Sequence, residues 1–164
     1  MGGINPSGAS GGHRENRMTG WMHEALAEAR LCLETGDVPV GALVLSANGE
    51  VIGRGRNERE LRKDPTAHAE VIALRAAAEA TGDWQLTGTT LVVTLEPCPM
   101  CAGAILAARV PTVVFGAWDE KAGAAGSVYD LLRDRRLPHR VEVLAGVEEQ
   151  QSAQLLREFF AGKR

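Results

Sequence analysis

The sequence has few aromatic residues, few cysteines and no long apolar run, and each shortage excludes a class of protein. Three Trp, three Phe and one Tyr in 164 residues are too few for a platform that stacks the bases of long single strands. No run of about 18 apolar residues occurs, so no membrane span is predicted. The N-terminal segment, MGGINPSGASGGHRENR, lacks the apolar stretch of a secretory signal, and we therefore expect a cytoplasmic protein.

What remains is the composition of one ordinary globular domain. Hydrophobic residues make up 45% of the chain, charged residues make up 24%, and the formal net charge is −3. A length of 164 residues suits a single domain whose core needs no disulfide to hold it together. The Gly- and Ser-rich start predicts a disordered tail over residues 1–17, followed by one domain over residues 18–164.

Basic residues are concentrated in two short segments, which together hold half of the 18 lysines and arginines. Clusters of this kind are most often solvated loops, and phosphate binding is an alternative that charge alone does not decide. The first segment contains Arg54, Arg56, Arg59, Arg62 and Lys63, and the second contains Arg133, Arg135, Arg136 and Arg140.

Hydrophobic periodicity predicts an α/β domain. The run Asn48-Gly49 between two apolar segments indicates a hairpin, and the later strand–helix–strand order requires parallel neighbours. We therefore expect a three-layer α/β/α fold with a mixed sheet of about five strands. Helices are predicted at 21–33, 68–80, 99–109, 129–132 and 148–160, and strands at 38–45, 50–55, 89–95, 112–117 and 140–146.

Two cysteines stand three residues apart in EPCPMCAGA, residues 96–104. Pro99 suits the first position of a helix, which places Cys98 at the N-cap and Cys101 in the first turn. The positive end of the helix dipole favours thiolates there, as either a redox pair or a metal site requires. Three cysteines in a chain without an export signal argue against a disulfide framework.

The motif DPTAHAE, residues 64–70, favours the metal site. His68 and Glu70 fall in the first turn of another predicted helix, and helix starts in layered α/β folds lie beside ligand sites. His68, Cys98 and Cys101 would give zinc three ligands and leave a position for water, whose pKa falls to about 7. Glu70 would carry the proton of that water to substrate. A lone capping histidine and a redox cysteine pair are the alternatives.

Together the two motifs match the H-x-E…P-C-x-x-C signature of zinc-dependent nucleobase deaminases. The chain resembles the bacterial tRNA-specific adenosine deaminases from about Met22 to Phe160. The zinc motifs alone are shared with cytosine, cytidine and guanine deaminases. The stretch VVFGAWDEKAGAAGS, residues 113–127, is more particular to the tRNA enzymes, and DVPVGA (37–42) and Asn57 match them as well.

The resemblance implies a cytidine deaminase-like fold, one Zn²⁺ per subunit, a homodimer, and no membrane association. It implies hydrolytic deamination of adenosine to inosine at the wobble position of tRNA anticodon loops, in bacteria that of the arginine tRNA. It makes Glu70 the proton shuttle and Asn57 the partner of the flipped base. Asp119 and Lys121 would line the path of neighbouring nucleotides, and both basic clusters would lie near the site. The alternatives are a free-base or nucleoside deaminase of guanine or cytosine type, and a non-catalytic zinc or redox protein.

Overall fold

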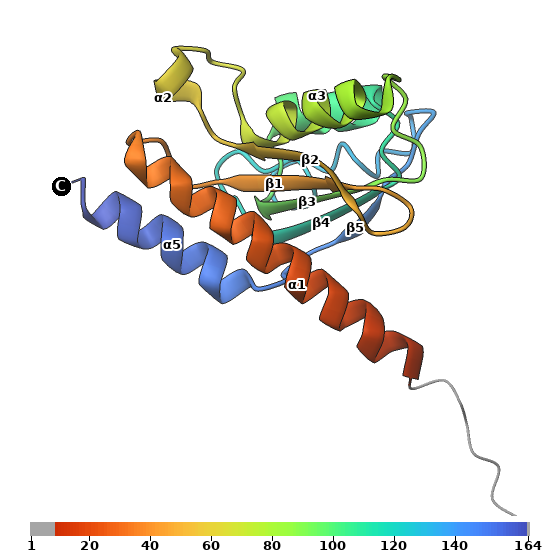
Figure 1. The fold of residues 1–164 in the computed structure, drawn as a ribbon, viewed down its shortest axis with the longest axis horizontal. Coiled ribbons are helices and arrows are strands. Elements are labelled where there is room, and N and C mark those ends of the chain that lie inside the picture. The colour runs from red at the N-terminus through yellow and green to blue at the C-terminus, as the bar shows by residue number, and fades with distance from the viewer. Residues whose placement is uncertain (1–8, 164) are drawn as a thin grey trace, which may run out of the picture.

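The computed structural model describes residues 9–163, and its first helix begins earlier than the sequence predicts. Helix α1 runs from Ala9 to Leu31, so residues 9–17, predicted as tail, form its first turns, while residues 1–8 lie outside the described residues. These turns project past the sheet (Figure 1). Arg14 pairs with Glu142, and the Arg17 guanidinium lies 5.9 Å from the ring centre of Trp21. The pair between Arg14 and Glu142 therefore links the first turns of α1 to the last strand of the sheet.

The remaining elements follow the predicted order with two differences. The single helical turn α2 (Arg59–Arg62) was not predicted. The short helix predicted at 129–132 is absent, because Ala125 and Asp130 form an isolated β-bridge there. The other elements are η2 (Cys32–Glu34), β1 (Gly41–Leu45), β2 (Val51–Arg56), α3 (Ala69–Thr81), β3 (Thr90–Leu95), α4 (Pro99–Ala107), β4 (Thr112–Ala117), β5 (Glu142–Leu144) and α5 (Glu149–Ala161).

The five strands form one mixed sheet in the order β2-β1-β3-β4-β5 (Figure 1). Strands β3, β4 and β5 are parallel, and β1 is antiparallel to both of its neighbours. The hairpin predicted only the β1–β2 pair. The second antiparallel pair arises because the connection from β2 through α3 to β3 carries the chain across β1. The predicted mixed sheet of five strands is confirmed.

Helices cover both faces of the sheet, with α3 and α4 on one face and α1 and α5 on the other (Figure 1). Side chains of β1 alternate between the two layers, as an extended strand requires. Ala42 and Val44 join the core under α3 and α4, whereas Leu43 and Leu45 pack against α1. The predicted three-layer α/β/α architecture is confirmed. None of the helices within residues 9–163 is long and apolar enough to cross a membrane.

Two glycines in β2 bring α3 unusually close to the sheet. A Cβ atom at Gly53 would lie 2.4 Å from the carbonyl oxygen of Ala73, and one at Gly55 would lie 2.2 Å from that of Ala69. Helix α3 therefore rests directly on the β2 backbone, and its first turn is held at the edge of the sheet where β3 and β4 end.

Candidate active site

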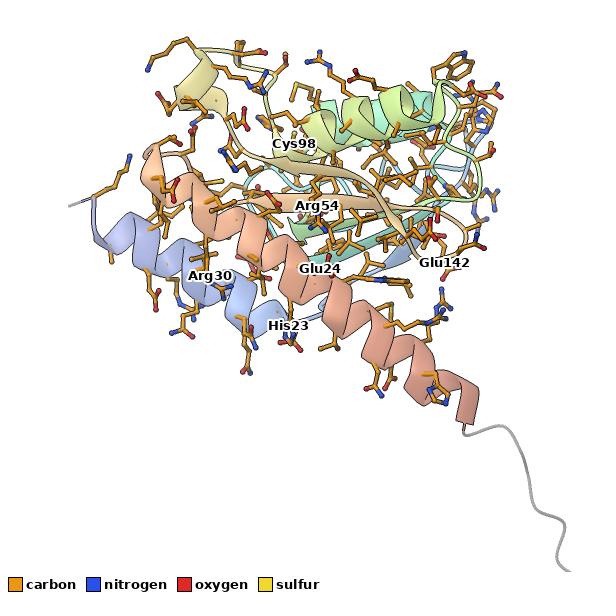
Figure 2. All side chains as sticks on the ribbon, in the orientation of Figure 1. His23, Glu24, Arg30, Arg54, Cys98 and Glu142 are labelled. Atoms are coloured by element: carbon orange, nitrogen blue, oxygen red, sulfur yellow. The ribbon has the colours of Figure 1, made fainter. Side chains whose placement is uncertain are left out.

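The first turns of α3 and α4 bring His68, Cys98 and Cys101 together. His68 and Cys98 are the N-cap residues of their helices, and Pro99 occupies the first position of α4. The Nδ1 atom of His68 lies 3.7 Å from the Cys98 sulfur and 3.5 Å from the Cys101 sulfur. Figure 2 shows Cys98 on the side of the sheet that α3 covers.

These three side chains fit a tetrahedral metal ion. One ligand atom from each lies within 4.8 Å of the other two, and no fourth His, Cys, Asp or Glu within residues 9–163 joins the group. Zinc bonds of about 2.3 Å to sulfur and about 2.0 Å to nitrogen place tetrahedral N and S ligands about 3.5 Å apart. The observed separations match that value. Three protein ligands leave a coordination position for water or substrate, as in catalytic rather than structural zinc sites.

The three side chains shift one another's pKa values. A hydrogen bond from Cys101, helped by one from His68, lowers the pKa of the Cys98 thiol to about 4. The same contact with Cys98, together with burial, raises the pKa of Cys101 well above its usual range. The hydrogen bond to Cys98 also raises the pKa of His68. A cation is the partner that lets both sulfurs be thiolates at once.

Glu70 lies in the first turn of α3, and its side chain points into the same cavity. The residue is only 4% exposed, and burial raises the pKa of its carboxyl. The cavity has a volume of about 190 Å³ and opens beside the ends of β3 and β4. Its walls combine apolar side chains from Val38, Val40 and Leu95 with polar ones from Asn57, Glu70 and Asp119.

The three residues that were predicted to contact substrate do not all line the cavity. Asn57 is 9% exposed and lines the cavity. Asp119 also lines it, and its Oδ1 accepts the backbone N–H groups of Lys121 and Ala122 at 3.1 and 3.2 Å, which shapes its own loop. Lys121 is exposed and lies outside the cavity, in a neighbouring groove of about 580 Å³ that also contains Asp119.

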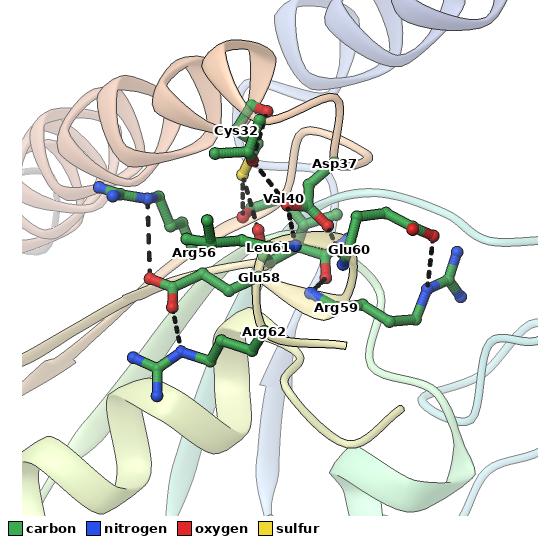
Figure 3. A network of polar contacts seen from close by, with 11 residues as sticks. Cys32, Asp37, Val40, Arg56, Glu58, Arg59, Glu60, Leu61 and Arg62 are labelled. Atoms are coloured by element: carbon green, nitrogen blue, oxygen red, sulfur yellow. Dashed lines mark hydrogen bonds and ion pairs between the residues drawn. The ribbon is translucent and has the colours of Figure 1, made fainter. Parts of the chain in front are cut away.

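A network of polar contacts joins Asp37 to the first turn of α2, next to Asn57 in the chain (Figure 3). The Asn57 side chain donates to the Val38 carbonyl at 3.1 Å and accepts the Arg59 N–H at 3.1 Å. Asp37 is fully buried, and its carboxylate accepts the N–H groups of Glu60 at 2.6 Å and Leu61 at 3.3 Å. Asp37 thereby caps the first turn of α2, whose residue Arg59 lines the cavity.

Sequence reasoning assigned no role to Asp37 or to Glu96, the two buried acids beside the site. Asp37 belongs to DVPVGA and Glu96 to TLEPC, so each is an acid at the end of an apolar segment. An acid at the end of an apolar segment is the signal that could have indicated a buried carboxylate bonded to backbone N–H groups. Glu96 is 2% exposed and lines the cavity, next to the loop that carries Asp119.

The two basic clusters lie in different places, although both were predicted to lie near the site. The first surrounds α2, and its members pair with carboxylates: Arg54 with Glu24, Arg56 and Arg62 with Glu58, and Arg59 and Lys63 with Glu60. In the second, Arg140 lines a hollow with Pro111 and Val141, which precede β4 and β5. Because β3, β4 and β5 are parallel, they all begin at one edge of the sheet and end at the other. Arg140 lies at the edge where these strands begin, whereas the cavity lies at the edge where they end. The prediction is therefore wrong for Arg140, whereas Arg133 of the same cluster lies against Gly126, in the segment that follows β4.

Comparison with known proteins agrees with this geometry. A family model described as MafB19-like deaminase matches residues 16–164. The chain is 49% identical over 140 residues to a tRNA-specific adenosine deaminase of Bacillus subtilis, covering 85% of this chain and 86% of that protein. It is 52% identical over 143 residues to a tRNA(Ile)-lysidine synthase of Deinococcus radiodurans, covering 87% of this chain but only 24% of that protein. A solved structure from a study of A-to-I editing at the wobble position of transfer RNA has a TM-score of 0.80 and 42% identity, covering 84% of this chain and 99% of that one.

Proposed function

Because the chain belongs to the MafB19-like deaminases, and within them to the tRNA-specific adenosine deaminases, we propose that it converts the wobble adenosine of a tRNA anticodon loop to inosine. The observation that carries the proposal is the convergence of His68, Cys98 and Cys101 beside the Glu70 carboxyl in one cavity. Water replaces the 6-amino group of the base, and the amine leaves as ammonia.

We assign one Zn²⁺ per subunit to His68 Nδ1 and the sulfurs of Cys98 and Cys101. When bound, the ion supplies Lewis acidity and an activated water near neutral pH. The ligand set suits zinc because two thiolates and one imidazole are its usual donors. The first turns of two helices hold these donors, so the site is pre-organised by the fold.

Glu70 carries the protons. Its carboxyl lies inside the cavity and away from bulk solvent, so protons pass between the reacting groups rather than to solvent. It takes a proton from the attacking water and delivers it to N1 of adenine. It then takes the remaining proton from the hydroxyl added at C6 and passes it to the amino group, which leaves as ammonia. A proton shuttle of this kind contributes about 10²- to 10⁴-fold in rate.

The flipped adenine fits between apolar and polar walls. Val38, Val40 and Leu95 give the base an apolar surface to pack on. Asn57 uses one N–H for the Val38 carbonyl and one lone pair for the Arg59 N–H, which leaves one of each for the base. The wobble base of an anticodon loop is not paired with another strand, so the cost of flipping it is low.

We propose that the rest of the RNA lies outside the cavity. We assign the neighbouring nucleotides to the groove that contains Asp119 and Lys121, with Lys121 facing phosphate. Arg59 lines the cavity and belongs to the basic cluster around α2, so we assign the phosphate contact to this cluster. An arginine tRNA in the cytoplasm is the expected substrate by family resemblance.

An apolar surface between α3 and α4 supports a homodimer. A shallow hollow of about 390 Å³ there is lined by Val71, Leu74, Ala78, Trp84, Ala104 and Ala107, and Trp84 is 58% exposed. Its small side chains allow a second copy to approach closely, and covering Trp84 would remove a large apolar group from water. Sedimentation of the wild type as a dimer and of Trp84→Glu as a monomer is the expected result. A wild type that sediments as a monomer at micromolar concentration contradicts the dimer.

The test of function uses an anticodon stem-loop with adenosine at the wobble position, and inosine is measured by nuclease digestion and mass spectrometry. We expect the wild type to form inosine and Glu70→Gln to lose about 10²-fold or more in rate while it retains zinc. Glu79→Gln, on the exposed face of the same helix, is the matched control and should retain full activity. Free adenine, guanine and cytosine are assayed in parallel. Turnover of a free base but not of RNA would establish the alternative, a free-base deaminase.

A further inference from the structure

Glu96 stands between the sheet and the metal-binding helix, and its carboxylate is surrounded by backbone amides. The residue directly follows β3, precedes Cys98 by two positions and is 2% exposed. One oxygen, Oε1, accepts the N–H of Asp119 at 3.0 Å. The other, Oε2, accepts the N–H groups of Ala125 and Ser127 at 3.0 and 3.1 Å.

Backbone amides take the place of a cation at this buried carboxylate. Within residues 9–163, no lysine, arginine or histidine forms an ion pair with Glu96. A buried carboxylate requires compensation, and hydrogen bonds from several N–H groups provide it. The three donors come from one segment, residues 118–127, which we call the cavity loop.

The cavity loop is folded around the Glu96 carboxylate. A Cβ atom at Gly123 would lie 2.3 Å from Glu96 Cδ, so the loop backbone touches the carboxylate directly. Within the loop, the Gly123 N–H donates to the Asp119 carbonyl at 2.8 Å, and the Ser127 hydroxyl donates to the same oxygen at 2.7 Å. The loop has no helix or strand of its own, so its shape depends on these contacts.

The cavity loop also supplies one wall of the site. Asp119 and Ala122 both line the cavity. The N–H of Asp119 itself donates to Glu96 Oε1, and Ala122 follows Asp119 by three positions. Displacement of the Asp119 backbone would therefore move this wall relative to Glu70. The metal-binding residues are attached differently, through the first turns of α3 and α4.

We propose that Glu96 is a positioning residue for substrate: its buried carboxylate holds the cavity loop against the site, and so sets how well the RNA is bound. The inference rests on the proposed function, because the bound molecule is the anticodon loop. It predicts that changes at Glu96 act on KM through the loop, while the metal site and the proton transfers at Glu70 remain intact.

Glu96→Gln tests the proposal with the smallest change in shape. An amide has one acceptor oxygen, and its NH₂ group must then face at least one backbone N–H, which breaks that hydrogen bond. We expect KM for the stem-loop to rise about tenfold, the effect of losing one hydrogen bond to a charged group, and kcat to change less than about threefold. Zinc content should stay equal to that of the wild type.

Amide hydrogen exchange provides a measurement that needs no substrate. The amides of Asp119, Ala125 and Ser127 are bonded to the Glu96 side chain, so their exchange should accelerate in Glu96→Gln, while the amides of β3 keep their protection. Gly123→Ala disturbs the same contact from the loop side and should reproduce the rise in KM. The double variant should be less than additive, because both changes break one interaction. Gly20→Ala, where a Cβ atom meets nothing within 4 Å, is the control.

The outcomes separate this inference from the proposed function. A wild type that makes no inosine contradicts the function, whereas an active wild type with unchanged KM in Glu96→Gln contradicts only the inference. Loss of zinc in Glu96→Gln would mean that the residue acts on Cys98 instead of the loop, and this also overturns it. If Glu96→Gln does not fold, Gly123→Ala carries the test from the loop side, and an unchanged KM in that variant overturns the inference.

Discussion

Replacing Asp37 with alanine should destabilise the protein strongly, although Asp37 belongs neither to the proposed metal site nor to the lining of the cavity. The residue is fully buried, and its carboxylate accepts the backbone N–H groups of Glu60 and Leu61 and the hydroxyl of Thr35 at 2.6, 3.3 and 2.6 Å. Alanine offers none of these hydrogen bonds. The single turn α2 would lose its cap, and two amide groups would be left without their acceptor.

The expected loss of stability follows from those groups. A buried donor left without a partner costs about 1–3 kcal/mol, and loss of a helix cap alone costs about 0.5–2 kcal/mol. Because α2 lies near the surface and water reaches part of it, we take about 3 kcal/mol in total. For a domain of this size, each kcal/mol lowers Tm by about 2–4 °C, so Tm should fall by about 6–12 °C.

Differential scanning calorimetry of the zinc-loaded protein measures this shift. The matched control is Asp83→Ala, since Asp83 also accepts a backbone N–H, that of Gln85 at 3.0 Å, but is exposed. Water can replace that hydrogen bond, so the control should lower Tm by less than about 3 °C. If Asp37→Ala shifts Tm no more than Asp83→Ala does, the buried cap contributes nothing and our reasoning about it is wrong.

Three further predictions concern packing, metal binding and charge. Gly116→Ala should cost about 1–3 kcal/mol in calorimetry, because a Cβ atom there would lie 2.4 Å from the Ser152 hydroxyl; an unchanged Tm would contradict the tight packing. Cys98→Ser should purify with less than one zinc per chain by elemental mass spectrometry, and full occupancy would exclude Cys98 as a ligand. Hydrogen bonds from Arg136 lower the pKa of Asp134 to about 2, and NMR titration should give that midpoint. Since the folded pKa lies below the unfolded one, this pair's stabilisation is complete above about pH 4 and is lost as pH falls toward 2. Arg136→Ala removes the guanidinium but keeps the backbone N–H, so it should raise the midpoint toward its usual range.

Local patterns in the sequence were enough to locate His68, Cys98 and Cys101, the ligands of the proposed metal site. Pro99 indicates a helix start, and Cys98 and Cys101 stand at fixed positions relative to it. His68 is placed in the same way by the start of α3. Such patterns predict the positions of these side chains because each set lies within one helical turn. The residues that cap this turn and set its periodicity are its neighbours in the sequence. The number of strands in the sheet and the three-layer arrangement were predicted from the same kind of short-range pattern.

Only the tertiary structure decided what surrounds those ligands. The hydrogen bonds of Asp37 reach residues 23 and 24 positions away, and those of Glu96 reach residues 23 to 31 positions away. Nothing in a local pattern specifies partners at that separation, since they meet only after the strands have paired and the loops have closed. The same cause placed β1 between β2 and β3, set Asp119 in the cavity and Lys121 outside it, and put Arg140 at the opposite edge of the sheet.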